Sequence, residues 1–94
     1  MRSGAAYLLS GGVQVREEKF GLLFYNYRGP RLYFIPTKDL IKTQFFDGKQ
    51  SVGKLIESIC AKHEAWPRKM VQKWVNQNLD MLEGKNLIYE QSIC

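Results

Sequence analysis

The stretch VQVREEKFGLLFYNYRGPRLYFIP, which runs from Val13 to Pro36, decides the fold class of this chain. Apolar side chains gather there in three segments, at residues 13–17, 22–27 and 31–35. The first segment alternates apolar and polar residues, which is the period of a half-buried strand, and Pro36 ends the third. Because the breaks between the segments are too short for a crossover connection, we expect three strands in an antiparallel meander.

Helical patterns fill the second half of the chain. We expect three helices, at residues 38–46, 52–62 and 66–83. Thr37 and Ser51 can cap the first two, and Pro67 occupies the first turn of the third, where proline is tolerated. Residues 86–90 fit a short final strand. The sequence therefore predicts an α+β fold, a three-stranded antiparallel meander followed by three helices.

Length, composition and charge restrict the class of protein. The 94 residues fit one domain at 13–90, with a flexible N-terminal arm at 1–12 and a tail at 91–94. The apolar residues before Ser10 are too few for a signal peptide or a membrane span, which predicts a cytoplasmic protein. A net charge of +5 favours an acidic partner, which could be nucleic acid, an anionic membrane or an acidic peptide. A basic protein without such a partner is the alternative.

Catalytic and metal-binding signatures are missing from the sequence. Cys60 and Cys94 lie far apart, with no Cys/His cluster that would predict a zinc site or a disulfide framework. The single histidine, His63, lies near the end of a predicted helix, where a solvated or capping role is typical. The chain also lacks a Gly-rich phosphate loop and a nucleophile motif. We therefore expect a protein that is not an enzyme and that uses no cofactor and no metal.

The predicted helix at 66–83 carries two stripes of side chains. The core stripe comprises Val71, Val75, Asn78, Leu79 and Leu82. The second stripe comprises Met70, Trp74, Gln77 and Met81. Methionine and tryptophan recur at peptide-binding surfaces, so the second stripe is a candidate site, and Lys69 and Lys73 beside it could attract acidic residues. The alternative is that both stripes are buried and that the two lysines lie on a solvated face.

The predicted third strand is a candidate partner for an extended peptide. It comprises Arg31, Leu32, Tyr33, Phe34 and Ile35. As the last strand of a meander it leaves one backbone edge free, to which a peptide could add as a further strand. If the helix with Trp74 lies beside this edge, its second stripe forms one wall of a peptide groove. The free edge is also compatible with either a monomer or a strand-exchanged dimer.

Two segments of the first half resemble the mycofactocin-system peptide chaperone family. They are VREEKFGLLFY at residues 15–25 and RLYF at residues 31–34. The family pattern has Val-Arg, an acidic residue, Phe-Gly, spaced apolar residues with a tyrosine, and then Arg-Leu-x-Phe. The match covers residues 13–36 well and the helical half only in its layout. Four residues of this pattern are either structural or in contact with a partner enzyme, and they are Val15, Arg16, Phe20 and Gly21.

The resemblance implies a function for the chain. The family is similar to the PqqD-like recognition elements of ribosomal peptide natural-product pathways, which have three strands and three helices in a winged-helix-like arrangement. Such domains bind the leader region of a precursor peptide as an added strand between the third strand and the third helix. For this chain the resemblance implies a non-catalytic chaperone that delivers the peptide to a radical S-adenosylmethionine maturase. No nucleic acid and no membrane is expected as a partner.

Two other functions stay compatible with the sequence. A winged-helix nucleic-acid-binding protein would read DNA with the helix that begins at Trp66, although Met70, Trp74 and Met81 suit apolar side chains better than base edges. A structural subunit of a larger enzyme would have no measurable affinity for a free peptide. Salt-dependent binding to duplex DNA separates the first of these from a peptide chaperone.

Overall fold

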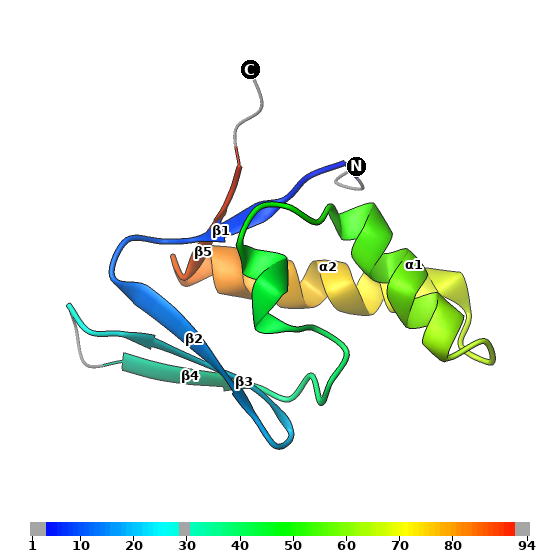
Figure 1. The fold of residues 1–94 in the computed structure, drawn as a ribbon, viewed down its shortest axis with the longest axis horizontal. Coiled ribbons are helices and arrows are strands. Elements are labelled where there is room, and N and C mark those ends of the chain that lie inside the picture. The colour runs from blue at the N-terminus through cyan, green and yellow to red at the C-terminus, as the bar shows by residue number, and fades with distance from the viewer. Residues whose placement is uncertain (1–3, 29–30, 92–94) are drawn as a thin grey trace.

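The computed structural model describes residues 4–28 and 31–91 of the chain. Its elements, in chain order, are β1 (Tyr7–Leu9), β2 (Val13–Glu18), β3 (Gly21–Asn26), β4 (Arg31–Ile35), the 3-10 helix η1 (Thr43–Phe46), α1 (Val52–Lys62), α2 (Arg68–Gly84) and β5 (Ile88–Glu90). In Figure 1, α2 crosses the middle of the molecule and α1 packs at one end of it. The β2–β3–β4 sheet lies on one side of α2, and the β1–β5 pair lies on the other.

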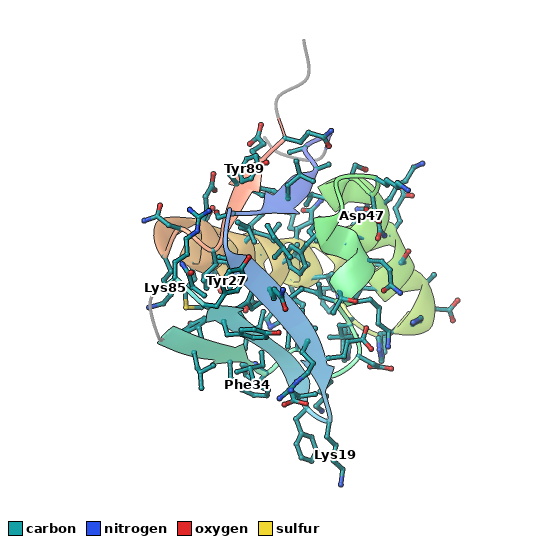
Figure 2. All side chains as sticks on the ribbon, turned by 60° about the vertical axis from the view of Figure 1, so that its left-hand side comes forward. Lys19, Tyr27, Phe34, Asp47, Lys85 and Tyr89 are labelled. Carbon is teal, nitrogen blue, oxygen red and sulfur yellow. The ribbon has the colours of Figure 1, made fainter. Side chains whose placement is uncertain are left out.

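The three-stranded antiparallel meander is confirmed. The strand order is β2-β3-β4, with Phe24 opposite both Val15 and Tyr33 in the register. Because side chains alternate along a strand, Phe24 and Ile35 point inward and are almost fully buried. The outer face of the sheet carries Gln14, Arg16, Leu23, Tyr25, Leu32 and Phe34. Figure 2 shows Phe34 on the side of the sheet that faces away from the helices.

The structure explains why residue 21, the first residue of β3, is a glycine. It pairs with Glu18 across a two-residue turn formed by Lys19 and Phe20. A Cβ atom at Gly21 would lie 1.9 Å from the backbone oxygen of Ile35, so a larger residue cannot fit unless the backbone moves. The glycine of the Phe-Gly pair is therefore needed for the close approach of β3 to the end of β4.

Both helices that follow residue 50 agree with their sequence patterns. The Ser51 side chain accepts a hydrogen bond from the Lys54 amide at 3.2 Å and so caps α1, as predicted. The helix α2 begins at Arg68, so Pro67 is its N-cap and not, as expected, a residue of its first turn. The core faces are confirmed for the buried residues Val52, Leu55, Ile56 and Ile59 of α1 and Val71, Val75, Leu79 and Leu82 of α2.

The expectation of three helices is wrong, because the described residues contain two α-helices. The predicted helix at 38–46 is replaced by a tight turn and by η1. The Thr37 amide donates to the Ile35 carbonyl oxygen at 2.9 Å across Pro36, and Lys38 has a φ of 52°, which ends any helical path there. The Lys38 amide donates to the Phe20 carbonyl oxygen at 2.8 Å, so contact with the β2–β3 turn holds this conformation.

The expected flexible arm at residues 1–12 needs correction in its second half. Tyr7–Leu9 form β1, which pairs antiparallel with β5, and the Tyr7 side chain is fully buried. The domain therefore extends back beyond residue 13. Residues 1–3 of the expected arm and 92–94 of the expected tail lie outside the described residues.

Candidate functional site

The edge strand β4 lies beside α2. The Tyr33 hydroxyl donates to the sulfur of Met81, and the Lys85 ammonium nitrogen lies 4.7 Å from the centroid of the Tyr33 ring. At the other end of β4, residues 36–38 line a pocket together with Met70 and Trp74. We call this contact zone the β4–α2 junction. The strand and the helix run along it in opposite directions, since Tyr33 in β4 meets the end of α2 and Pro36 after β4 meets its first half.

One outer edge of the three-stranded sheet lies at β4 and the other at β2. Within residues 4–28 and 31–91, β4 pairs with β3 only, so its second edge has no strand partner. The β2 side has a different neighbour, because η1 packs against β2 and the Thr43 amide donates to a Glu17 carboxylate oxygen at 3.4 Å. The β4 edge is therefore the better candidate for pairing with an added strand.

The β4 residues named from the sequence differ in what they offer. Leu32 and Phe34 are 72% and 44% exposed and point to the outer face of the sheet. Ile35 is 1% exposed and belongs to the core. Tyr33 is half-buried and faces α2. The Arg31 side chain lies outside the described part of the structure.

The second stripe of α2 is partly open to solvent. Met70 and Met81 are 49% and 42% exposed, and Gln77 is exposed as well. Trp74 is half-buried and packs against the core. The alternative in which both stripes are buried therefore does not hold. The side chains of Lys69 and Lys73 are exposed on α2, as the solvated-face alternative expects.

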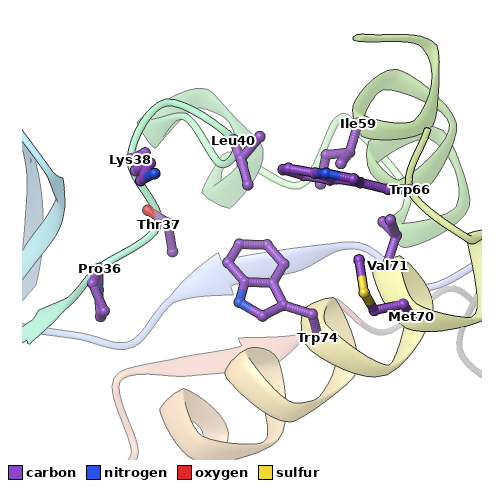
Figure 3. A pocket seen from close by; sticks show the side chains of 9 residues that line it. All are labelled: Pro36, Thr37, Lys38, Leu40, Ile59, Trp66, Met70, Val71 and Trp74. Carbon is purple, nitrogen blue, oxygen red and sulfur yellow. The ribbon is translucent and has the colours of Figure 1, made fainter. Parts of the chain in front are cut away.

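A pocket lies between the end of β4, α1 and the first half of α2 (Figure 3). Its volume is about 280 Å3, and its lining is mostly apolar. Two indole rings form opposite parts of its wall, one from Trp66 in the α1–α2 loop and one from Trp74 of α2. Leu40 and Ile59 close it from above in this view. We call this cavity the Trp66–Trp74 pocket.

Trp66 is held in place by His63. The two rings stack with their centroids 3.9 Å apart and their planes 8° from parallel. The Trp66 amide also donates to the His63 carbonyl oxygen at 2.9 Å. The histidine near the end of α1 therefore fixes the orientation of the indole that forms the outer wall of the pocket.

Sequence reasoning missed most of this pocket. Trp66 counted only as the start of a helix, Pro36 as the end of a strand, and Leu40 as part of a helix that does not exist. The available signal was an indole directly before a helix-starting proline, one helical turn from Met70 and two from Trp74. Periodicity cannot find such a site, because its walls come from three separate segments.

The described residues contain no candidate metal site and no helix that could span a membrane. Within residues 4–28 and 31–91, no three His, Cys, Asp or Glu side chains gather where they could hold a metal ion. Among the helices that the structure describes, none combines the length and hydrophobicity of a membrane-spanning segment.

Comparisons with known proteins identify the family of the chain. No curated protein and no solved structure matches it. A family model described as the peptide chaperone MftB family matches residues 6–88, from just before β1 to the start of β5. The match confirms the resemblance of residues 13–36 to the mycofactocin-system chaperone, and it includes the helical half. The chain therefore belongs to the peptide chaperone MftB family.

Proposed function

We propose that the protein is a non-catalytic chaperone that binds the leader region of a ribosomally made precursor peptide along the β4 edge. The bound peptide forms an added strand and is presented to a radical S-adenosylmethionine maturase. Membership in a peptide chaperone family supports the general role. The binding mode is supported by one observation above all. The edge of β4 that faces away from β3 has no strand partner in the described part of the chain, and it lies beside the methionine and tryptophan stripe of α2.

Strand addition explains how one surface can hold a peptide without a deep cleft. Main-chain hydrogen bonds along β4 supply affinity for any extended backbone, and alternate side chains supply specificity. Side chains that point toward the helices meet Tyr33 and the exposed stripe of α2, whereas those on the other side lie next to Leu32 and Phe34. Met70 and Met81 are suited to this role because unbranched thioethers adapt to different neighbours.

The charge of the chain favours an acidic peptide. The net charge is +5, and Lys69, Lys73 and Lys85 lie on or next to α2. Exposed ammonium groups contribute little to affinity one by one, but together they raise the rate of encounter with an acidic segment. The association rate should therefore depend more strongly on ionic strength than the dissociation rate does.

An NMR titration with a candidate precursor peptide tests the binding mode. We expect the backbone amide signals of residues 32–38 and 70–81 to shift, while those of β1 and β5 stay in place. The variant Trp74→Ala removes an indole from the junction and should weaken binding at least tenfold. Tyr89→Ala is the matched control, because Tyr89 is 47% exposed on β5, at the opposite end of the molecule from Lys19 (Figure 2).

Other outcomes of the titration would reject the proposal. Amide shifts confined to the β2 edge would place the peptide elsewhere. No response to the peptide, together with strongly salt-dependent binding of duplex DNA through α2, would favour a nucleic-acid-binding protein.

A reconstituted reaction tests the presentation step. The maturase, the peptide and the chaperone are combined, and the modified peptide is measured by mass spectrometry. We expect the yield to fall when the chaperone is omitted or carries Trp74→Ala, and to return with Tyr89→Ala. Equal yields with and without the chaperone would remove the maturase from the proposal.

A further inference from the structure

The Trp66–Trp74 pocket has room for one large side chain. Its volume of about 280 Å3 lies just below the range of roughly 300–1,000 Å3 typical of sites for whole small molecules. The cavity reaches the surface, because Trp66 is 38% and Met70 is 49% exposed. A side chain can therefore enter while the backbone that carries it stays outside.

The walls of the pocket favour an aromatic guest over an aliphatic one. Two indoles and the Met70 thioether line it, and both ring–ring and sulfur–ring contacts add to simple burial of apolar area. His63 occupies one face of the Trp66 ring by stacking at 3.9 Å, which keeps that indole from turning into the cavity. The preformed geometry lowers the entropic cost of binding a flat ring.

Cationic residues outnumber acidic ones among the residues that line the pocket and their neighbours in the sequence. Lys38 lines it, and Lys69 and Lys73 lie on the turn of α2 that also carries Met70. Asp39 and Glu64 are the carboxylates nearest in sequence to the lining residues Lys38 and Trp66. The three cations outnumber them, so acidic residues are favoured on either side of the aromatic guest.

The pocket adjoins the end of β4. Pro36 lines the pocket and directly follows Ile35, the last residue of the strand. Because a strand rises about 3.3 Å per residue, a peptide paired with β4 reaches the pocket within one or two further residues. The residue that enters the pocket therefore lies at one end of the paired segment and not in its middle.

We propose that the Trp66–Trp74 pocket selects precursor peptides by taking one aromatic side chain that is flanked by acidic residues, at the end of the segment paired with β4. The inference rests on the proposed peptide-chaperone function and adds the chemical class of the anchoring residue. It also assigns His63 as a positioning residue, which acts by holding the Trp66 ring.

Three acidic pentapeptide amides test the inference without knowledge of the natural peptide. They have the same glutamate residues around a central Phe, Leu or Ala, and their binding is measured by NMR titration of the whole chain. We expect the Phe peptide to bind roughly three- to tenfold more tightly than the Leu peptide, with the Ala peptide weakest. The indole N–H signals of Trp66 and Trp74 should shift with the Phe peptide.

Two variants show whether the preference comes from the pocket. Trp66→Leu keeps an apolar wall but removes the ring, and we expect the preference for Phe over Leu to fall below about twofold. His63→Ala removes the ring that stacks on Trp66 and should also reduce the preference for Phe over Leu. In the proposal His63 acts only through Trp66 and does not contact the peptide. Tyr89→Leu changes an exposed aromatic residue on β5 and should leave the preference intact.

Failure of this inference is distinguishable from failure of the proposed function. Equal binding of the three pentapeptides, or unchanged indole signals, overturns the pocket assignment even when the precursor peptide binds along β4. Binding of N-acetyl-phenylalaninamide as tight as that of the Phe peptide would identify a small-molecule site and also overturn it. Absence of binding by the precursor peptide itself would reject the chaperone function.

Discussion

The Tyr33 hydroxyl donates a hydrogen bond to the sulfur of Met81, and this contact joins the edge strand β4 to α2. The Lys85 ammonium group lies over the same ring, 4.7 Å from its centroid. Tyr33 thus links the sheet to the candidate binding stripe through its side chain. A thioether is a weak acceptor, so the ring itself contributes more to the link than the hydroxyl does.

The variant Tyr33→Phe separates these two contributions. It keeps the ring and the Lys85 contact but removes the hydrogen bond, so we expect the free energy of unfolding to fall by about 0.5 kcal/mol. Urea denaturation followed by circular dichroism measures the change. Tyr27→Phe is the control, since Tyr27 is 68% exposed. A loss above about 1.5 kcal/mol would mean that the hydroxyl, and not the ring, holds β4 to α2.

Two glycine substitutions should change stability in opposite directions. Gly21→Ala places a Cβ atom against the Ile35 backbone oxygen, and we expect a loss of about 3 kcal/mol or more, because neither backbone can move freely. A Cβ atom at Gly84, at the end of α2, would meet no described atom within 4 Å beyond its chain neighbours and the nearby helix backbone, so Gly84→Ala should add about 0.5 kcal/mol through helix propensity. Thermal unfolding of both variants checks the pair. A Gly21→Ala protein as stable as the wild type would contradict the close approach of β3 and β4.

Two hydroxyl groups offer a similar contrast. The Thr37 side chain is 1% exposed and its hydroxyl oxygen has no hydrogen-bond partner among residues 4–28 and 31–91, so Thr37→Val should raise the free energy of unfolding by about 1 kcal/mol. Ser51→Ala removes the cap of α1 and should lower it by about 1 kcal/mol. Urea denaturation of both variants measures the difference. A destabilised Thr37→Val protein would show that an ordered water satisfies the hydroxyl.

Charge reversal at Lys73 should slow the association of an acidic peptide. We expect Lys73→Glu to reduce the association rate several-fold at low ionic strength, and the difference to disappear above about 0.5 M salt. Lys49→Glu changes the net charge by the same amount from an exposed position between η1 and α1, away from the β4–α2 junction. Stopped-flow fluorescence of the tryptophans follows both variants. An equal effect of the two substitutions would point to overall charge instead of the junction.

The sequence predicted those elements whose signals are local. Three short apolar segments with brief breaks between them predicted the β2-β3-β4 meander, because connections of that length allow only antiparallel pairing. The cap at Ser51 and the apolar spacing after it likewise predicted α1. Both signals arise within a few residues of where they act.

The errors occur where distant contacts determine the local structure. Lys38 leaves the helical region because its amide pairs with the Phe20 carbonyl oxygen, which no pattern at 38–46 reveals. Tyr7 belongs to a strand of three residues, too short to show a period, and its partner Glu90 lies near the other end of the chain. Propensity alone could not recover either feature.

The candidate site also has one part that local sequence patterns predict and one part that depends on distant contacts. The stripe that contains Met70, Trp74 and Met81 follows from helical periodicity, and its partial exposure distinguishes it from a second core face. Trp66 has no periodic relation to β4 or to Leu40, so the pocket that they share emerges only from the fold.

The pairing of β1 with β5 affects the order in which the protein forms during translation. Tyr7 is made early, yet the strand that pairs with β1 follows every other described element. While the ribosome is still producing α2, the aromatic ring of Tyr7 lacks part of its final cover, and the nascent domain stays open at this side. β1 can therefore pair only after residues 88–90 have been made, and a chain truncated before Ile88 would leave β1 exposed to proteases.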